Sequence, residues 1–230
     1  MNDKKRLKDI INIVDPGKMV IDVGTDHGLV PLYLAKNAIS NNILATDISA
    51  PSLKKLEDEL DENLRKSIKT KVTDGFKGIE IQPNQIAIIA GMGGNTIIDI
   101  IDDSMDFAKN LDYMILASNI ATEKLRRFLT ENNFKITRDF LTYENNKYYD
   151  ILKVEYGNAN SLDLSEIYYG FENIENKNPL LIAKLEEDYK KNKGFRESIL
   201  LNSKDKTGIE KIDERLKAID EVYKKCKLEN

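Results

Sequence analysis

The sequence predicts an α/β fold: a mostly parallel sheet with an antiparallel terminal strand, helices on both faces, and a C-terminal helical hairpin. Short apolar runs alternate with amphipathic stretches from residue 19 to about residue 155. The apolar runs are continuous, which is typical of parallel strands that are buried on both faces. After Tyr156 the strand signals end and helical spacing dominates. We therefore expect a sheet domain at residues 1–160 and a helical, coiled-coil-like domain at residues 161–230.

The first part of the sheet domain contains three apolar runs and two amphipathic stretches. The predicted strands are 19–24, 42–48 and, within 69–76, a shorter strand followed by an Asp-Gly turn. The predicted helices are 27–39, which begins inside a glycine loop, and 51–64. In the second helix the leucines at 53, 56, 60 and 64 recur at the spacing of one buried helical face. Pro51 suits the first turn of that helix.

The second part continues the alternation and then changes character. A strand that runs into a glycine-rich turn is predicted at 85–94 and another strand at 113–119, with helices at 95–103 and 121–133. Residues 134–156 read as two β-rich segments that turn at Glu144-Asn145-Asn146, which predicts the antiparallel end of the sheet. The polar stretch after Tyr156 is expected to be a connector. Helices at 179–203 and 207–228 would then form an antiparallel hairpin.

Composition excludes several classes of protein. No apolar run reaches 18 residues and no basic-then-apolar leader opens the chain, so we expect neither a membrane span nor a signal peptide, and a cytoplasmic location. The single cysteine, Cys226, excludes a disulfide or a cysteine-based zinc site, and the single histidine, His27, excludes a multi-histidine metal site. The net charge of −4 is not that of an obvious nucleic-acid binder, although basic stretches occur at 4–8, 189–196 and 223–227.

Polar or glycine-rich residues follow all five predicted parallel strands. They are Gly24-Thr25-Asp26-His27-Gly28, then Asp47, Asp74-Gly75, Gly91-Met92-Gly93-Gly94 and Ser118-Asn119. Ligands of doubly wound sheets bind at the carboxyl ends of the strands, where these residues would meet. One glycine loop would be weak evidence, and this loop is not the dinucleotide fingerprint. Five such strand ends in one unit predict a ligand site.

The acidic residues indicate which ligand this site would bind. Asp47 lies about 20 residues after the first loop, where a carboxylate accepts hydrogen bonds from a ribose diol. Asp74 could bond an adenine amino group or simply shape the Asp-Gly turn. An acid at the loop tip would repel the pyrophosphate of a dinucleotide. S-adenosylmethionine has no phosphate and carries a sulfonium cation, so the sequence favours it over NAD.

Several short motifs together resemble the bacterial tRNA (adenine-22-N1)-methyltransferase family. They are DVGTDHG at 22–28, TD at 46–47, DG at 74–75, AGMGG at 90–94 and SN at 118–119. The resemblance continues through YYDILKVEYG at 148–157 and NPLLIAKLE at 178–186, and so covers nearly the whole chain. It implies a Rossmann-like class I methyltransferase domain followed by a coiled-coil-like domain. It also implies methylation of N1 of an adenine in the D-arm region of tRNA.

The resemblance implies roles for individual residues. The expected catalytic residues are Asp26, His27 and Asn119. The expected cofactor-binding residues are Asp22, Gly24, Thr25, Gly28, Asp47, Ile48, Asp74, Gly75, Gly91 and Met92. Asp26 would stabilise the positive charge that builds on the purine ring, because neutral adenine N1 already holds a lone pair and needs no base. His27 could contact the base, fix Asp26 or cap the next helix. Asn119 follows Ser118, where the family pattern leads us to expect a proline, so its role is less defined.

The expected partner is tRNA, gripped by lysines and arginines of the C-terminal hairpin, with no membrane and no metal. We expect a monomer or a weak dimer. The hairpin could instead only stabilise the domain or drive dimerisation. Two other functions stay open at this point: a methyltransferase that acts on a small molecule, and a non-catalytic protein that binds S-adenosylmethionine or RNA.

Overall fold

The computed structural model describes residues 4–25, 27–202 and 208–226. By its internal contacts the chain divides into two compact units. The first, called here the sheet unit, comprises Met1–Arg138 and Thr142–Asn160. The second, called the helical unit, comprises Ser161–Asn230 with three residues of the sixth strand, Asp139–Leu141. In the described part of the chain, no helix is both long and apolar enough to cross a membrane.

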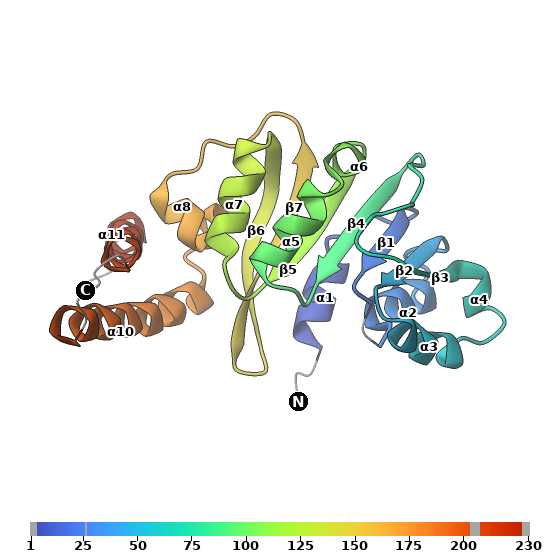
Figure 1. The fold of residues 1–230 in the computed structure, drawn as a ribbon, viewed down its shortest axis with the longest axis horizontal. Helices are drawn as coiled ribbons and strands as arrows, with labels where there is room; N and C mark the ends of the chain where they lie inside the picture. The colour runs from blue at the N-terminus through green and yellow to red at the C-terminus, as the bar shows by residue number, and fades with distance from the viewer. Residues whose placement is uncertain (1–3, 26, 203–207, 227–230) are drawn as a thin grey trace. The chain divides into compact units, whose positions relative to one another are not determined.

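A seven-stranded sheet forms the centre of the sheet unit (Figure 1). Its strands are β1 (Met19–Val23), β2 (Ile43–Asp47), β3 (Ile68–Val72), β4 (Gln85–Ala90), β5 (Tyr113–Ser118), β6 (Phe134–Glu144) and β7 (Lys147–Tyr156). The strand order is β3-β2-β1-β4-β5-β7-β6. The first five of these pair in parallel, and β7 pairs with β5 antiparallel. The predicted fold class, including the antiparallel end, is thereby confirmed.

The strand order reverses direction between β1 and β4, which are neighbours in the sheet but far apart in the chain. Chain crossings leave the sheet in opposite directions on either side of this point, so a crevice opens between the loops that follow the two strands. The residues of β4 and β5 are almost completely buried, as expected for central strands covered on both faces. This rigid centre fixes the positions of the loops at the strand ends.

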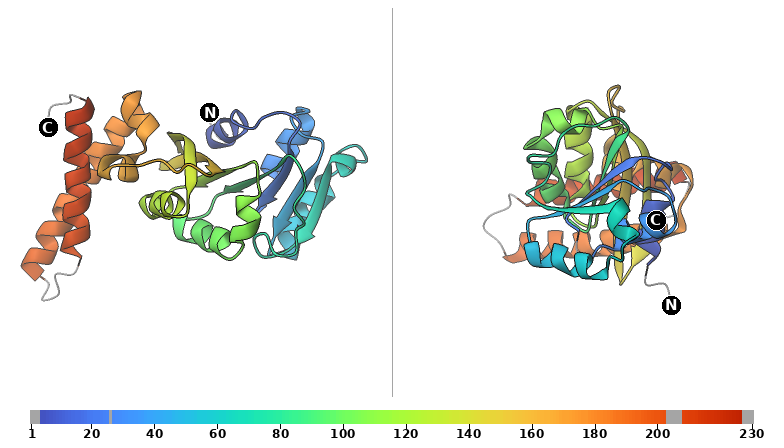
Figure 2. Two further views of the ribbon diagram at one scale, coloured as in Figure 1. Left: turned by 90° about the horizontal axis from the view of Figure 1, so that it is seen from above. Right: turned by 90° about the vertical axis from the view of Figure 1, so that its right-hand side faces the viewer.

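Helices flank both faces of the sheet. In the sheet unit they are α1 (Lys5–Ile11), α2 (Leu29–Lys36), α3 (Ala50–Glu59), α4 (Leu64–Ser67), α5 (Gly94–Asp102), α6 (Met105–Lys109) and α7 (Thr122–Glu131). α5 packs against α7, and α1 against α2. Figure 2 shows α1 on the opposite side of the sheet from α5, α6 and α7. Leu53 and Leu56 of α3 are buried, in agreement with the predicted apolar face.

The predicted helix at 51–64 is wrong beyond Glu59. Leu60 has an extended backbone, which ends α3. Asp61 then accepts hydrogen bonds from the backbone N–H groups of Asn63 and Leu64 through its Oδ1, at 2.9 and 2.8 Å. These side-chain hydrogen bonds compete with continuation of the helix and form the turn that precedes the short helix α4.

The helical unit contains α8 (Leu164–Tyr169), α9 (Phe171–Glu175), α10 (Pro179–Asn202) and α11 (Ile209–Cys226). α10 and α11 pack against each other, and α11 also contacts α8 and α9. The stretch predicted to be only a connector therefore holds two helices. Asp163 and Glu166 form a reciprocal capping box that starts α8, a local signal that the polar composition obscured.

Candidate active site

A cavity of about 630 Å³ lies at the carboxyl ends of β1, β2, β3 and β4, within the sheet unit. This volume is within the range of pockets that bind cofactors and small molecules. Nine of the residues predicted to bind cofactor or substrate line it: Asp22, Gly24, His27, Asp47, Ile48, Asp74, Gly75, Gly91 and Met92. Four separate strand ends thus come together at one cavity, although 70 residues separate Asp22 from Met92 in the sequence.

The other predicted site residues lie elsewhere. Thr25 and Gly28 are buried and are not among the described residues that line the cavity, and neither is the half-buried Asn119. Asn119 follows β5, and the next residue, Ile120, accepts a hydrogen bond from the N–H of Gly94 through its carbonyl oxygen at 2.9 Å. Asp26, a predicted catalytic residue, lies outside the described residues. The roles assigned to these four residues stay predictions.

The end of β1 places a buried carboxylate at the cavity. Asp22 is 5% exposed, and the Thr25 hydroxyl donates to its Oδ2 at 2.5 Å. The N–H groups of Gly24 and Thr25 both donate to the carbonyl of Thr46 in β2, which holds the start of the loop against the sheet. Burial raises the pKa of Asp22 to about 7, and the nearby charge of Asp47 adds to this shift, whereas the Thr25 hydrogen bond opposes it.

Two glycines of the first loop are required for different reasons. Gly24 has a φ of +76°, and a Cβ there would lie 2.1 Å from Cε of Met92. Gly28 has a φ of +63°, and its Cβ would lie 2.3 Å from a methyl group of Leu56 in α3. Left-handed backbone strains any other residue at both positions. Gly24 therefore lets the loop after β4 close one wall of the cavity, whereas Gly28 lets the start of α2 approach Leu56 of α3.

Asp47 ends β2 and turns the chain towards α3. Its Oδ1 accepts a hydrogen bond from the N–H of Ser49 at 2.7 Å. Ser49, in turn, is the N-cap of α3, and its side chain accepts from the N–H of Ser52. Ser49, and not Asp47, is therefore the residue that caps α3. Beside Asp47, the side chain of Ile48 is 74% exposed and offers an apolar surface to the cavity.

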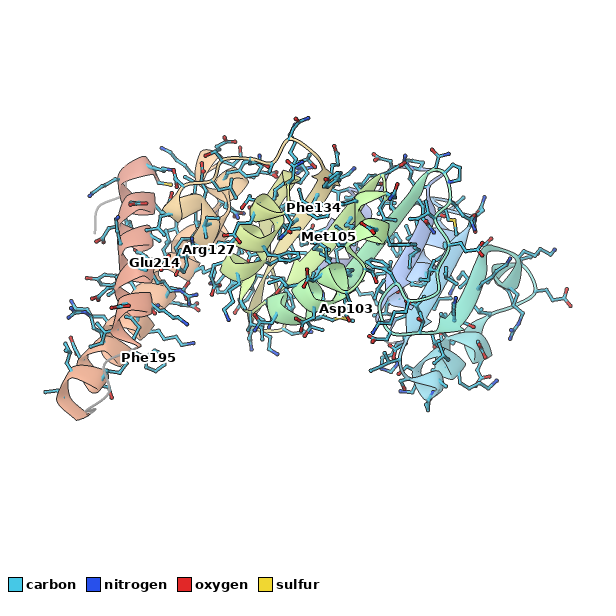
Figure 3. The ribbon with its side chains drawn as sticks, turned by 45° about the horizontal axis from the view of Figure 1, so that its top comes forward. Asp103, Met105, Arg127, Phe134, Phe195 and Glu214 are labelled. Atoms are coloured by element: carbon cyan, nitrogen blue, oxygen red, sulfur yellow. The ribbon has the colours of Figure 1, made fainter. Side chains whose placement is uncertain are left out.

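The lining carries a marked excess of negative charge. Five of its described residues are aspartates: Asp22, Asp47, Asp74, Asp99 and Asp103. Lys77 lies near two of them, 2.5 Å from Asp74 and 3.4 Å from Asp103. Asp103, at the C-terminal end of α5, is labelled in Figure 3. Low-dielectric walls with carboxylates of one sign attract cationic ligands.

Sequence reasoning missed the part of the lining that α1 and α5 supply. α1 contributes Arg6, Leu7 and Ile10, and α5 contributes residues such as Asp99 and Ile100. The apolar residues of α1 do recur at helical spacing, so the helix itself could have been found. That its side chains reach this cavity could not, because it depends on how α1 packs on α2.

Within residues 4–25, 27–202 and 208–226, no group of three or more histidine, cysteine, aspartate or glutamate side chains could hold a metal ion. The described polar side chains that line the cavity are five aspartates, two threonines, one arginine and one histidine.

Comparisons with known proteins agree on the family. The family described as a methyltransferase domain matches residues 3–152. The tRNA (adenine(22)-N(1))-methyltransferase of Bacillus subtilis is 26% identical over 158 residues, which cover 68% of this chain and 66%, just under two thirds, of that protein. A Mycoplasma genitalium protein, described as a "putative tRNA methyltransferase", is 32% identical over 156 residues, which cover 66% of this chain and 69% of that protein.

Solved structures show the same fold over both units. The crystal structure of Sp1610 from Streptococcus pneumoniae, described as a "putative tRNA (m1A22) methyltransferase", matches with a TM-score of 0.85 at 25% identity and covers 95% of this chain and 98% of that chain. A structure of the same protein in complex with S-adenosyl-L-methionine matches with a TM-score of 0.83 at 24% identity, over 96% and 99% of the two chains. The chain is thus similar to the tRNA (adenine-22-N1)-methyltransferase of B. subtilis. Because the family model matches residues 3–152 and one relative is 32% identical, the chain belongs to the methyltransferase-domain family.

Proposed function

We propose that this chain is an enzyme that methylates N1 of an adenine in tRNA, adenine-22 in the D-arm region, with S-adenosylmethionine as methyl donor. The observation that carries the proposal is the acidic cavity at the ends of β1 to β4, which joins nine of the predicted site residues. The B. subtilis relative is named for this reaction, and the S. pneumoniae protein binds this cofactor.

The residues present fit the cofactor. Its sulfonium and ammonium groups are cationic, and the cavity is lined by five aspartates. Gly24 and Gly91 both have positive φ, and the space beside Gly91 is open, so a ligand can approach the backbone there. The same aspartates would repel the negatively charged phosphates of a dinucleotide.

Each part of the lining would hold a different part of the cofactor. Asp47 would accept hydrogen bonds from the ribose hydroxyls, and Asp74 from the adenine amino group. Ile48 and Met92 would pack against the flat faces of the rings. Asp22 would lie near the cationic groups. The bound cofactor supplies a methyl group on a positively charged sulfur, and the chain aligns adenine N1 with it.

The substrate base must leave its stack to enter such a cavity, because N1 lies on the pairing edge of adenine. We propose that Asp26 and His27 contact the base, and that Asn119 helps to place it. We further propose residues 1–160 as the catalytic domain and residues 161–230 as a helical domain that contacts tRNA phosphates. Exposed Lys190, Lys191 and Lys193 of α10 support this assignment. Phe195, labelled in Figure 3, is half exposed on the same helix.

The proposal is tested by incubating the protein with unmodified bulk tRNA and radiolabelled S-adenosylmethionine, followed by nucleoside analysis. Label in 1-methyladenosine, lost when adenine-22 of a transcript is replaced by guanine, is the expected result. Label in another nucleoside would reject the proposed base. Cofactor binding without label in tRNA would point to a small-molecule acceptor or to a binding protein.

Asp26→Ala is expected to lower kcat for tRNA about 100-fold, because a carboxylate beside the purine ring stabilises its developing positive charge. The dissociation constant of S-adenosylhomocysteine, measured by calorimetry, should change less than threefold. Asp58→Ala, on the exposed face of α3, is the control and should leave both quantities unchanged. A near wild-type rate for Asp26→Ala would remove Asp26 from the proposed catalytic residues.

Affinity for S-adenosylmethionine is expected to rise with pH up to about pH 7. The pKa of Asp22 is about 7 in the folded protein, so below this pH the group is largely neutral. A cationic ligand favours the carboxylate, so binding expels a proton and affinity increases by up to about tenfold per pH unit between pH 5 and 7. Titration calorimetry at several pH values measures this slope. Asp22→Asn should abolish most of the slope, and an unchanged slope would contradict the assignment to Asp22.

A further inference from the structure

One arginine stands among the acidic residues of the cavity. Of the described lining residues, Arg6 of α1 is the only lysine or arginine, in the company of five aspartates. A cation placed in a cavity that otherwise attracts cations weakens that attraction unless it meets an anion of the ligand. Within the basic stretch at residues 4–8, Arg6 is therefore more than part of a solvated helix face.

The β6–β7 hairpin holds Arg6 in place. The guanidinium carbon lies 4.5 Å from the centroid of the Tyr149 ring, a cation–π arrangement. Oε1 of Glu144 accepts a hydrogen bond from the backbone N–H of Arg6 at 3.2 Å, and Oε2 lies 3.6 Å from its Nε. The side chain of Arg6 is 27% exposed and that of Glu144 only 9%. Two residues that lie more than 130 positions from Arg6 in the sequence, Glu144 and Tyr149, thus hold its side chain in one orientation.

In this arrangement the guanidinium can still donate hydrogen bonds to a ligand. The group carries five N–H donors in a planar fork. Among the contacts of the described residues, Glu144 approaches the Nε side and Tyr149 lies against the face. The fork formed by the terminal nitrogens matches a carboxylate, which it can bind through two parallel hydrogen bonds.

We propose that Arg6 binds the carboxylate of the amino-acid end of S-adenosylmethionine, with Tyr149 and Glu144 as its positioning residues. The inference rests on the proposed function, since it assumes that cofactor. The cofactor has one anionic group, its α-carboxylate, and the lining offers one arginine for it.

The sheet order supports this placement. Asp47 and Asp74, proposed to hold the adenosine, follow β2 and β3 at one edge of the sheet, whereas Tyr149 and Glu144 belong to β7 and β6 at the other. Arg6 is therefore held from the side opposite the adenosine end. An extended ligand anchored at Asp47 and Asp74 would direct its amino-acid end across β1 and β4 towards Arg6.

The test compares two ligands that differ at this end. S-adenosylhomocysteine carries the amino-acid carboxylate, and 5′-methylthioadenosine keeps the adenosine and thioether but lacks it. Calorimetry measures both dissociation constants for the wild type, Arg6→Gln, Arg6→Lys and Lys8→Gln. Lys8 is an exposed residue of the same helix that does not line the cavity and serves as the matched control. Thermal unfolding of each variant verifies that it folds.

We expect Arg6→Gln to weaken binding of S-adenosylhomocysteine about tenfold or more, with less than a twofold change for 5′-methylthioadenosine. Arg6→Lys should recover part of the loss, because it keeps the charge without the fork. Tyr149→Leu should weaken S-adenosylhomocysteine selectively but less strongly.

Equal weakening of both ligands would show that Arg6 only shapes the cavity and would overturn the inference. Unchanged affinity for both, with a raised KM for tRNA, would assign Arg6 to a phosphate of the substrate and would also overturn it. If the wild type bound neither ligand, the proposed cofactor itself would be wrong. The failure of the inference is thus distinguishable from the failure of the proposed function.

Discussion

Replacing Asp150 by asparagine is expected to lower the free energy of unfolding of the sheet unit by about 3–5 kcal/mol. Oδ1 of Asp150 in β7 lies 2.7 Å from Nη2 of Arg126 in α7. The Arg126 side chain is fully buried and that of Asp150 is 9% exposed. Loss of the carboxylate leaves a buried guanidinium without this counter-charge, and a buried charge is costly when its partner is removed.

This ion pair also joins α7 to the sheet. Asp150 lies opposite Ser118 in the β5–β7 register, and Ser118 leads into the loop with Asn119 that starts α7. The pair therefore ties α7 to β7, beside the end of β5. Urea denaturation measures the loss of stability. The double variant Arg126→Met with Asp150→Leu is the control, because it removes both charges and should cost much less than Asp150→Asn alone. Equal losses in the two variants would show that the charge imbalance is not the cause.

Replacing Gly94 by alanine is expected to lower the free energy of unfolding by about 3 kcal/mol and to disturb cofactor binding. A Cβ at Gly94 would lie 2.4 Å from the carbonyl oxygen and 2.8 Å from the carbonyl carbon of Ala121. Both are backbone atoms at the start of α7, where Ala121 already has a φ of +56°. The Gly94 N–H also donates a hydrogen bond to the Ile120 carbonyl oxygen at 2.9 Å, and this bond would be stretched if the two backbones moved apart.

The consequence for the site follows from the loop before Gly94. Gly91 and Met92 line the cavity, so a shift of the start of α5 moves one of its walls. Thermal or urea unfolding and calorimetry with S-adenosylhomocysteine measure the two effects. Gly194→Ala, in the middle of α10, is the control for the replacement of a glycine by alanine. A Cβ at Gly194 would meet nothing within 4 Å, so this change should stabilise the helix by about 0.5–1 kcal/mol. A neutral effect of Gly94→Ala would contradict the close approach of the two loops.

The strand pattern of the sheet domain could be read from the sequence because each strand is a continuous apolar run with a polar or glycine-rich end. QIAIIA became β4 and YMILAS became β5, nearly as predicted. The same ends supplied nine cavity residues, since parallel strands bring their carboxyl ends to one edge. The family and the fold class predicted from these motifs are confirmed by the comparisons.

The elements that were missed are short or begin with side-chain caps. α8 starts at the Asp163–Glu166 capping box inside a stretch whose composition predicts a connector. α3 ends at Glu59 although its leucine spacing continues to Leu64, because Asp61 caps a new turn. In both places a few local hydrogen bonds outweigh periodicity, and a pattern averaged over many residues does not register them.

The sequence by itself determined which strand-end loops carry glycines and which carry carboxylates. From these residue types it also determined the kind of ligand that we expect. Only the tertiary structure decided which of these residues share a cavity. It also decided that Thr25 donates a hydrogen bond to Asp22 and is not among the described residues that line the cavity, and that Arg6 reaches the same cavity from a helix outside the motifs. The physical reason is that local composition fixes strands and turns, whereas the approach of side chains separated by more than a hundred residues, such as Arg6 and Glu144, depends on the packing of whole elements.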